Sequence, residues 1–226
     1  MPPALGHNRI AMKIPLFPLD VVLFPGAALP LHIFEERYRE MMRECLDREQ
    51  TFGVVRARRE GMAVIGCSAQ IVAVLNQYPD GRFDILCQGR DRFEIELLDD
   101  SRSFLQAEVK LLVDNSATGH PGRSIDSTRA EREQCAALHF ELSQLTNAAG
   151  DEDETVIFPH LDLDDAISFQ LADAIPSDLE FKQELLSLRS DAQRCKRLTE
   201  FYGTVLPKLR RGSLASKHVA GNGLVM

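Results

Sequence analysis

The residues that could carry chemistry fall into three small groups. The first consists of His160 followed by Asp162, Asp164 and Asp165. Imidazole and carboxylate groups can hold a divalent cation, but the glycine and the distal glutamate of an EF-hand loop are missing. Aspartates just before a helix also complement the positive end of the helix dipole. This second interpretation predicts an acidic loop that leads into a helix, and no metal site.

His32 lies close to Glu35 and Glu36, which suggests an acid–base group. No nucleophile or oxyanion donor can be placed beside it, so we expect His32 to face a neighbouring strand and the two glutamates to open a helix. Ser216 and Lys217 have the composition of a catalytic dyad. Adjacent residues in a glycine-flanked tail cannot be held in catalytic geometry, so we discard this pair.

The motifs of nucleotide and hydrolase chemistry are missing from the sequence. It contains no G-x-x-x-x-G-K-[ST] loop, no G-x-G-x-x-G after a strand, no G-x-S-x-G elbow and no H-E-x-x-H. The six histidines never pair at the spacing of metal ligands. We therefore expect no catalytic, cofactor-binding or metal residues, and neither ATPase nor peptidase activity.

Charge and hydropathy narrow the class of protein further. The 226 residues include 34 acidic and 26 basic ones, for a net charge of −8, which disfavours nucleic-acid binding. The longest nearly apolar stretch, 24–34, is too short to span a bilayer and is interrupted by prolines. The five cysteines are odd in number and widely spaced, which is typical of reduced, buried thiols. We expect a cytoplasmic protein without membrane contact; its cysteines are Cys45, Cys67, Cys87, Cys135 and Cys195.

An RNA-binding role stays open as the alternative. A groove lined by Arg37, Arg39, Arg56 and Arg58 would support it. However, Glu35 and Arg39 pair at i,i+4, which is typical of a solvated helix face. Aromatic residues make up only 7% and tryptophan is absent, so platforms for base stacking are scarce.

The first half of the chain has the apolar pattern of strands. Short apolar runs such as 14–17 and 21–24, and alternating segments up to about Val113, predict a β-rich domain at 13–115. Pro79-Asp80-Gly81 predicts a turn between two of its strands. One helix is expected to start near Phe34, because apolar residues then recur at i, i+3, i+4, i+7 and i+8.

The second half has the pattern of helices. Residues 114–127 are polar and contain glycine and proline, which predicts a linker. Four apolar stripes then predict a four-helix C-terminal bundle at 126–212, with Gly212 as the stop and with flexible tails at 1–12 and 213–226. The fold class is therefore α+β. The residues expected to be mostly buried in the bundle include Cys135, Leu138, Leu142, Leu198, Tyr202 and Leu209.

Three segments together resemble one known family. Residues 14–38, IPLFPLDVVLFPGAALPLHIFEERY, resemble the opening of the Lon protease N-terminal domain. Gly89-Arg90-Asp-Arg-Phe93 resembles a Gly-x-x-Arg-Phe turn of that family, and the stretch from Phe169 to Arg197-Leu198 resembles its helical segment. The resemblance covers about residues 13–210.

The resemblance implies a PUA-like pseudo-barrel β-domain followed by helices. It also implies a role in capturing protein substrates, whereas the AAA+ module and the Ser-Lys peptidase that follow in full-length Lon have no counterpart in this chain. Unfolded protein or peptide segments are then the expected partners, together with a separate protease or ATPase that acts with the chain. The oligomeric state is left open.

Irregular β-segments interrupted by prolines leave edges that can accept an extended peptide. The residues expected to bind a partner lie in such a segment, although the hydrophobic core is the simpler interpretation for most of them. They are Phe17, Phe24, Pro25, Leu31 and Phe34.

Overall fold

The structure is a computed structural model that describes residues 12–115, 125–147 and 167–221. Within these residues the chain forms seven strands and five helices, which group into two compact units. The β unit consists of the described residues up to Val113 together with Ile175–Ser187. The helical unit consists of the described residues of Asp114–Ala174 and of Leu188–Met226.

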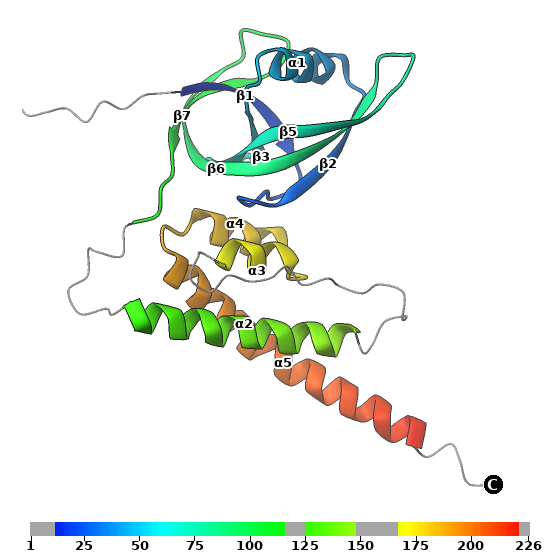
Figure 1. Ribbon diagram of the computed structural model, residues 1–226, viewed down its shortest axis with the longest axis vertical. Helices are drawn as coiled ribbons and strands as arrows, with labels where there is room; N and C mark the ends of the chain where they lie inside the picture. The colour runs from blue at the N-terminus through cyan, green and yellow to red at the C-terminus, as the bar shows by residue number, and fades with distance from the viewer. Residues whose placement is uncertain (1–11, 116–124, 148–166, 222–226) are drawn as a thin grey trace, which may run out of the picture. The chain divides into compact units, whose positions relative to one another are not determined.

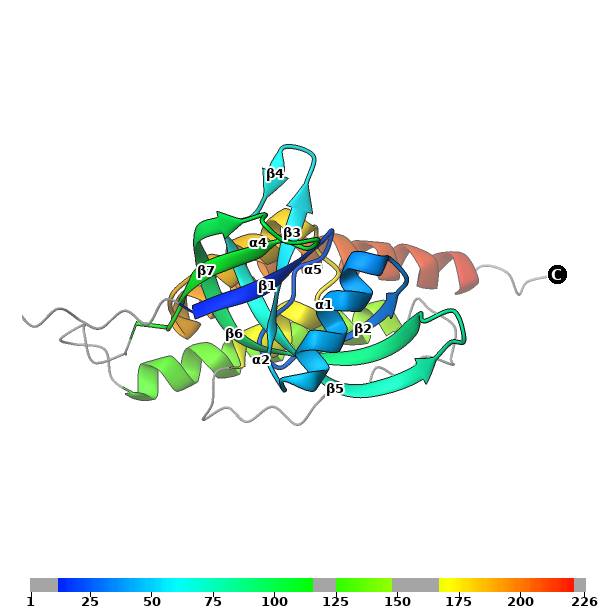
Figure 2. The same cartoon turned by 90° about the horizontal axis from the view of Figure 1, so that it is seen from above.

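Strands of the β unit pair into a closed ring (Figure 1). The order is β1, β7, β6, β5 and β3, and β3 pairs back with β1. The β1–β3 pair is parallel and the other pairs are antiparallel. β2 adds to the first half of β6, and the β3–β4 hairpin projects from the ring (Figure 2). The strands are β1 (Met12–Leu19), β2 (Ala28–Ile33), β3 (Phe52–Arg58), β4 (Gly61–Met62), β5 (Ile65–Gln77), β6 (Phe83–Asp99) and β7 (Gln106–Leu111).

Helix α1 (Glu36–Asp47) covers the larger of two core clusters of the β unit. Its buried residues are Tyr38, Met41, Met42 and Cys45, which are the apolar positions that the sequence places on one helical face. Their side chains pack with strand residues that include Phe52 and Ile85. The helix predicted near Phe34 is therefore confirmed.

A second core cluster surrounds Phe93 inside the ring. Phe93 is fully buried, together with residues of β1, β3 and β7. A Cβ atom on Gly53 would lie 2.6 Å from Cζ of Phe93, and one on Gly66 would lie 2.7 Å from the same atom. Both distances are far below a normal contact, so glycine at these two positions makes room for the ring of Phe93.

The segment from Gly89 to Phe93 joins three parts of the β unit. A Cβ atom on Gly89 would lie 2.1 Å from the carbonyl oxygen of Phe24, and the Gly89 N–H donates to the carbonyl of Ala27 at 2.9 Å. Arg92 is buried and donates from Nη1 to the carbonyl oxygen of Leu186 at 2.7 Å. The segment from Gly89 to Phe93 therefore contacts the loop before β2 and the helix that contains Leu186, and it supplies the ring of Phe93 to the core.

One strand prediction needs correction. Residues 21–24, expected as a strand, form a loop, while β2 follows at Ala28–Ile33. Pro25 and Gly26 form a turn that reverses the chain at the end of this loop. The backbone of the turn therefore forms hydrogen bonds with that of Gly89. Of the segments expected up to Val113, the longest is the single strand β6, which runs from Phe83 to Asp99.

Helix α4 (Leu179–Ser187) belongs to the β unit, although the sequence places its stripe in the bundle. Gln183 donates from Nε2 to the carbonyl oxygen of Ile65 at 3.0 Å, and Leu186 accepts the hydrogen bond from Arg92. These polar contacts join it to the sheet, so the described part of the helical unit holds three helices. These are α2 (Ile125–Asn147), α3 (Ser168–Ala174) and α5 (Asp191–Gly221).

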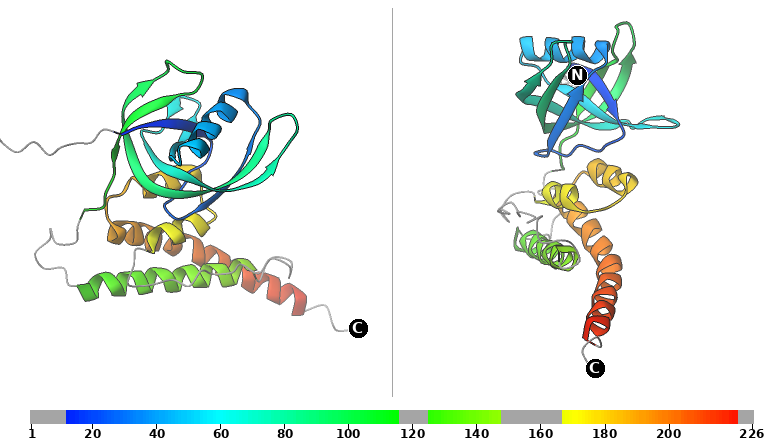
Figure 3. Two further views of the ribbon diagram at one scale, coloured as in Figure 1. Left: turned by 45° about the horizontal axis from the view of Figure 1, so that its top comes forward. Right: turned by 90° about the vertical axis from the view of Figure 1, so that its right-hand side faces the viewer.

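Helix α5 runs beside α2 within the helical unit (Figure 3). It continues to Gly221, so Gly212 does not end it and residues 213–221 are helical, in contrast to the predicted tail. A glycine inside a helix costs only about 1 kcal/mol relative to alanine, which a long helix tolerates. Pro207 lies inside the same helix.

Most of the predicted bundle core is confirmed. Cys135, Leu142, Leu198 and Tyr202 are buried, whereas Leu138 and Leu209 are half-buried. Next to Leu138, His139 is 5% exposed, and its Nδ1 lies 2.9 Å from the hydroxyl oxygen of Tyr202.

The burial of His139 predicts a pH dependence of stability. Burial lowers the pKa of His139, so the unfolded chain binds a proton more readily than the folded one. The free energy of unfolding should therefore fall as the pH drops below the ordinary histidine pKa of about 6.5. Urea unfolding at several pH values between about 7.5 and 5 measures this slope, and His139→Gln should flatten it. An unchanged slope in that variant would contradict the assignment.

Candidate functional site

The structure separates the five predicted partner-binding residues by exposure. Phe17 and Phe24 are buried in the core, where the ring of Phe17 meets that of Tyr38 edge-on at 4.4 Å. Pro25 and Leu31 are half-buried, and Leu31 packs against the same core. Phe34 is 59% exposed. Of the five, only Phe34 therefore offers most of its side chain to a partner.

An open strand edge lies on β5. β3 pairs with β5 only at 67–69, while β5 continues to Gln77 and pairs there with β6 on its other side. In the described residues no strand pairs with the outer edge of β5 from Gln70 to Gln77. This stretch carries no charged residue.

Apolar side chains accompany this edge. Val72 is 48% exposed, Val74 39% and Leu75 59%. The pairing of β5 with β6 shifts register between Ile71 and Ala73 and again after Val74, and each shift places an extra residue in β5. These shifts break the alternation that the sequence analysis relied on, which is why these residues were missed. The signal that could have found them is an uncharged apolar run from Ile71 to Leu75.

His32 takes part in a polar cluster on the β2–β6 pair. Its Nδ1 lies 2.6 Å from Oδ1 of Asp84, and the hydroxyl of Tyr78 donates to Oδ2 of Asp84 at 2.8 Å. Both hydrogen bonds lower the pKa of Asp84, and that of His32 has the larger effect. The ring of Phe34 stacks on His32, with centroids 6.1 Å apart.

This cluster replaces the acid–base group suggested by the sequence. His32 faces the neighbouring strand β6, as expected, with Asp84 as its partner. Glu35 pairs with Arg37 at 2.8 Å, and Glu36 is the first residue of α1. None of the hydrogen bonds described for His32 involves a serine, threonine or cysteine, so the imidazole has no nucleophile to activate in the described part of the chain.

The cysteines are free and buried. Burial raises the pKa of Cys45 to about 11 and that of Cys67 and Cys87 to about 12. A hydrogen bond with Cys135 and burial raise the pKa of Cys195. A thiol attacks as its thiolate, so the four thiols with a raised pKa are unreactive near neutral pH.

The arginines proposed for an RNA groove are engaged in ion pairs or lie on another element. Arg56 is 2.9 Å and Arg58 is 3.5 Å from Glu180 of α4. Arg37 and Arg39 lie on α1, where Arg37 pairs with Glu35. A carboxylate on Arg56 and Arg58 competes with phosphate for the same guanidinium groups.

Neither a metal cluster nor a membrane-spanning helix is found in the described residues. No three His, Cys, Asp or Glu side chains of that part of the chain could hold a metal ion together. His160 and the aspartates after it lie outside the described residues. Where the chain is described, no helix combines the length and the hydropathy needed to cross a bilayer.

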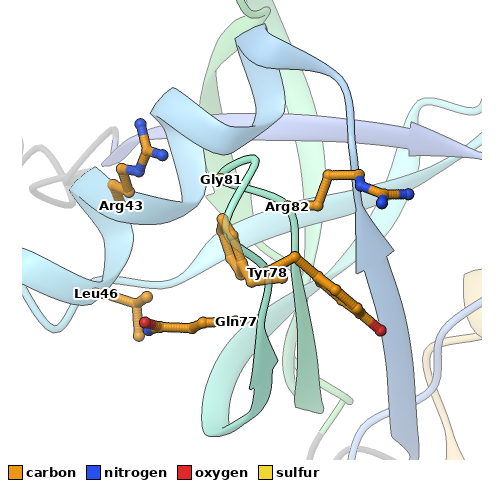
Figure 4. A pocket seen from close by; sticks show the side chains of 7 residues that line it. Arg43, Leu46, Gln77, Tyr78, Gly81 and Arg82 are labelled. Atoms are coloured by element: carbon orange, nitrogen blue, oxygen red, sulfur yellow. The ribbon is translucent and has the colours of Figure 1, made fainter.

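A cavity of about 150 Å³ lies between α1 and the turn that joins β5 to β6 (Figure 4). Arg43 stands on α1 at one side, and Tyr78 and Arg82 stand on the hairpin at the other. Gly81 has a φ of +85° in the turn, as the Pro79-Asp80-Gly81 pattern predicts. The cavity is lined by Arg43, Leu46, Gln77, Tyr78, Gly81, Arg82 and Phe83.

The fold defines the class of protein. A Lon N-terminal domain protein from Xanthomonas campestris matches 83% of this chain and 96% of its own with a TM-score of 0.59 and 22% identity. The N-terminal domain of Mycobacterium avium complex Lon protease matches 85% of this chain and 98% of its own, with a TM-score of 0.61 and 16% identity. The chain therefore has the fold of a Lon N-terminal domain.

Sequence comparison then identifies the family. Residues 13–202 match the ATP-dependent protease La (LON) substrate-binding domain, and the chain belongs to this family. Lon protease of Parabacteroides distasonis is 27% identical over 206 residues, and that of Cytophaga hutchinsonii is 24% identical over 199 residues. The matches cover 85% and 84% of this chain, but only 24% of each relative.

Proposed function

We propose that this chain binds extended segments of other proteins as a recognition domain of Lon-type proteolysis, without catalysis of its own. The observation that carries this proposal is the open, uncharged edge of β5 in a member of a substrate-binding family. An unpaired strand edge presents a row of N–H and C=O groups that an extended backbone can match. Most of the affinity then comes from main-chain hydrogen bonds, and side chains beside the edge add specificity.

The exposed side chains support a preference for apolar segments. Val72 and Leu75 offer apolar surface along β5 that a folded, soluble partner would not cover. The other outer strand, β2, carries Pro30, which has no N–H to donate. We therefore assign the binding edge to β5, and we retain Phe34 as the one exposed contact among the five residues predicted from sequence.

Several finer assignments belong to the same proposal. The closed ring of five strands supports a PUA-like pseudo-barrel. The bound segments would be unfolded proteins or peptides of the cytoplasm, and a separate ATPase or protease would process them. No nucleotide loop or reactive thiol in the described residues argues for chemistry by the chain itself.

Lysine at the β5 edge should weaken binding strongly. A charge at an edge strand prevents pairing with another chain, so Val72→Lys/Leu75→Lys should weaken the binding of unfolded casein by about tenfold or more. Fluorescence anisotropy of labelled casein measures the affinity. Leu97→Lys is the matched control, because Leu97 is also 59% exposed but lies in the second half of β6.

Equal losses in the control and the edge variant would contradict the assignment to β5. Absence of casein binding by the unaltered chain would refute the proposed function. RNA binding that is lost on Arg56→Glu/Arg58→Glu, in a chain that does not bind casein, would establish the alternative instead.

A further inference from the structure

Arg43 is an unneutralised cation at the cavity between α1 and the β5–β6 turn. The side chain is exposed, and it forms no hydrogen bond or ion pair with any residue that the structure describes. Arg82, on the opposite wall, is paired with Asp80 at 2.7 Å and lies over the ring of Tyr78 at 5.3 Å. The charge available to a ligand is therefore that of Arg43.

Arg39 adds a second positive charge at the same turn. Its Nη1 donates to the carbonyl oxygen of Asp80 at 2.8 Å, whereas its Nε is buried and has no hydrogen-bond partner in the described residues. A Cβ atom added to Gly81 would lie 2.8 Å from Nη1 of Arg39 and 3.3 Å from Nη2 of Arg43. Two guanidinium groups thus approach one point, in a protein of net charge −8. Like charges at i,i+4 repel each other, and a bound anion would relieve this repulsion.

The size and lining of the cavity limit what the anion can be. About 150 Å³ is well below the ~300–1,000 Å³ of pockets that take cofactors and drug-sized molecules. Leu46, Phe83 and the ring of Tyr78 supply apolar wall next to the guanidinium of Arg43. Such a wall accepts one side chain, and the planar guanidinium group matches the two oxygens of a carboxylate.

The cavity also continues the open edge of β5. Gln77, the last residue of β5, is part of its lining, and the uncharged edge runs from Gln70 to Gln77. A segment paired along this edge would extend by about 3.3 Å per residue towards Arg43. Polypeptide is therefore the ligand class that geometry and charge favour over a free small anion.

We propose that this cavity is a subsite for an acidic residue flanked by apolar residues in the bound polypeptide. The subsite rests on the proposed binding of extended segments at β5, and it adds a preference for carboxylates at one end of that edge. Arg43 is the specificity-determining residue, and Arg39 positions the turn and adds to the positive potential.

Two labelled peptides test the subsite. One alternates glutamate with leucine and phenylalanine, and the other has glutamine at every glutamate position. The glutamate peptide should bind the unaltered chain about three- to tenfold more tightly at low salt, the range of a partly exposed charge pair. Arg43→Gln should abolish this preference while the affinity for the glutamine peptide stays the same. Inorganic phosphate should compete with the glutamate peptide only.

Arg37→Gln is the matched control, because Arg37 lies on the same helix but pairs with Glu35. Equal binding of both peptides by the unaltered chain would overturn the subsite and leave the proposed function standing. A preference that survives in Arg43→Gln, or that Arg37→Gln removes equally, would also overturn it. Phosphate binding at Arg43 without any preference for the glutamate peptide would assign the site to a free anion instead. Failure of both peptides and of casein to bind would refute the subsite and the proposed function together.

Discussion

Replacing Arg194 with alanine should lower the free energy of unfolding of the helical unit by about 3 kcal/mol, because it removes a fully buried guanidinium group together with its hydrogen bonds and its ion pair. Arg194 is fully buried, and Nη1 donates to Oδ1 of Asp114 and to the carbonyl oxygen of Leu188, both at 2.9 Å. Its Nε donates to Oγ of Ser168 at 2.7 Å, and its guanidinium group lies over the ring of Phe169 at 4.0 Å. The variant would remove all of these contacts at once, including the hydrogen bond to the buried Ser168.

Urea unfolding followed by circular dichroism measures this loss. Arg197→Ala is the control, because Arg197 is three residues further along α5 and its partner Glu200 is exposed. Exposed pairs contribute about 0–1 kcal/mol, so this variant should be close to the unaltered chain. The double variant Arg194→Ala/Asp114→Ala should be less destabilised than the sum of the two single variants, because the contact between the two residues is lost only once. Additive losses would show that the two residues do not act as a pair.

Replacing Phe93 with alanine should destabilise the β unit by about 3–5 kcal/mol, the usual range for a buried phenylalanine. The ring is fully buried and fills the space that Gly53 and Gly66 leave inside the closed ring of strands. Neither glycine can supply replacement atoms, so the cavity would remain open. The same unfolding measurement applies, with Phe34→Ala as a control that removes a mostly exposed ring and should cost much less.

A second pair of variants tests why glycine occupies position 53. Gly53→Ala should destabilise the unaltered chain by about 1–3 kcal/mol, because its Cβ would overlap Cζ of Phe93 and Cδ2 of Leu16. In the Phe93→Leu background the cost should be smaller, since a shorter side chain leaves more room. Equal costs in both backgrounds would mean that the overlap with Phe93 is not the reason for the glycine.

Sequence patterns predicted the turns and helices that depend on interactions between residues close together in the sequence. The turn at Pro79-Asp80-Gly81 and the helical spacing from Tyr38 to Cys45 depend on neighbours in sequence, and both were confirmed. Strand β2 was missed because its pairing with β6, such as that of His32 with Asp84, joins residues about 50 positions apart. The sequence of residues 28–33 alone does not indicate which strand they pair with.

Helix α4 shows a different limit. Its apolar spacing predicted a helix, and the helix forms, but the packing partner was wrong. That partner is selected by single polar contacts, those of Gln183 with Ile65 and of Leu186 with Arg92. An amphipathic stripe indicates that a face is covered and leaves open which surface covers it.

The candidate site was the part least accessible to sequence reasoning. Prolines near Phe17 and Phe24 suggested open β-segments, yet both rings are core residues. The β5 edge depends on where β3 stops pairing, which is a property of the assembled sheet. Arg43 stands out only once the turn at Gly81 is seen to lie beside it and Arg39.

The closure of the ring has a consequence for the order in which the chain assembles. β1 pairs with β3 and with β7, whose residues follow it by about 40 and about 90 positions. During synthesis at about 5–20 residues per second, β1 must wait at least several seconds before β7 exists. α4 completes the same unit later still, after the first part of the helical unit has been made. β1 is thus made before the other strands of this unit but is among the last to be fully paired, and until then its edge is open to pairing with another nascent chain.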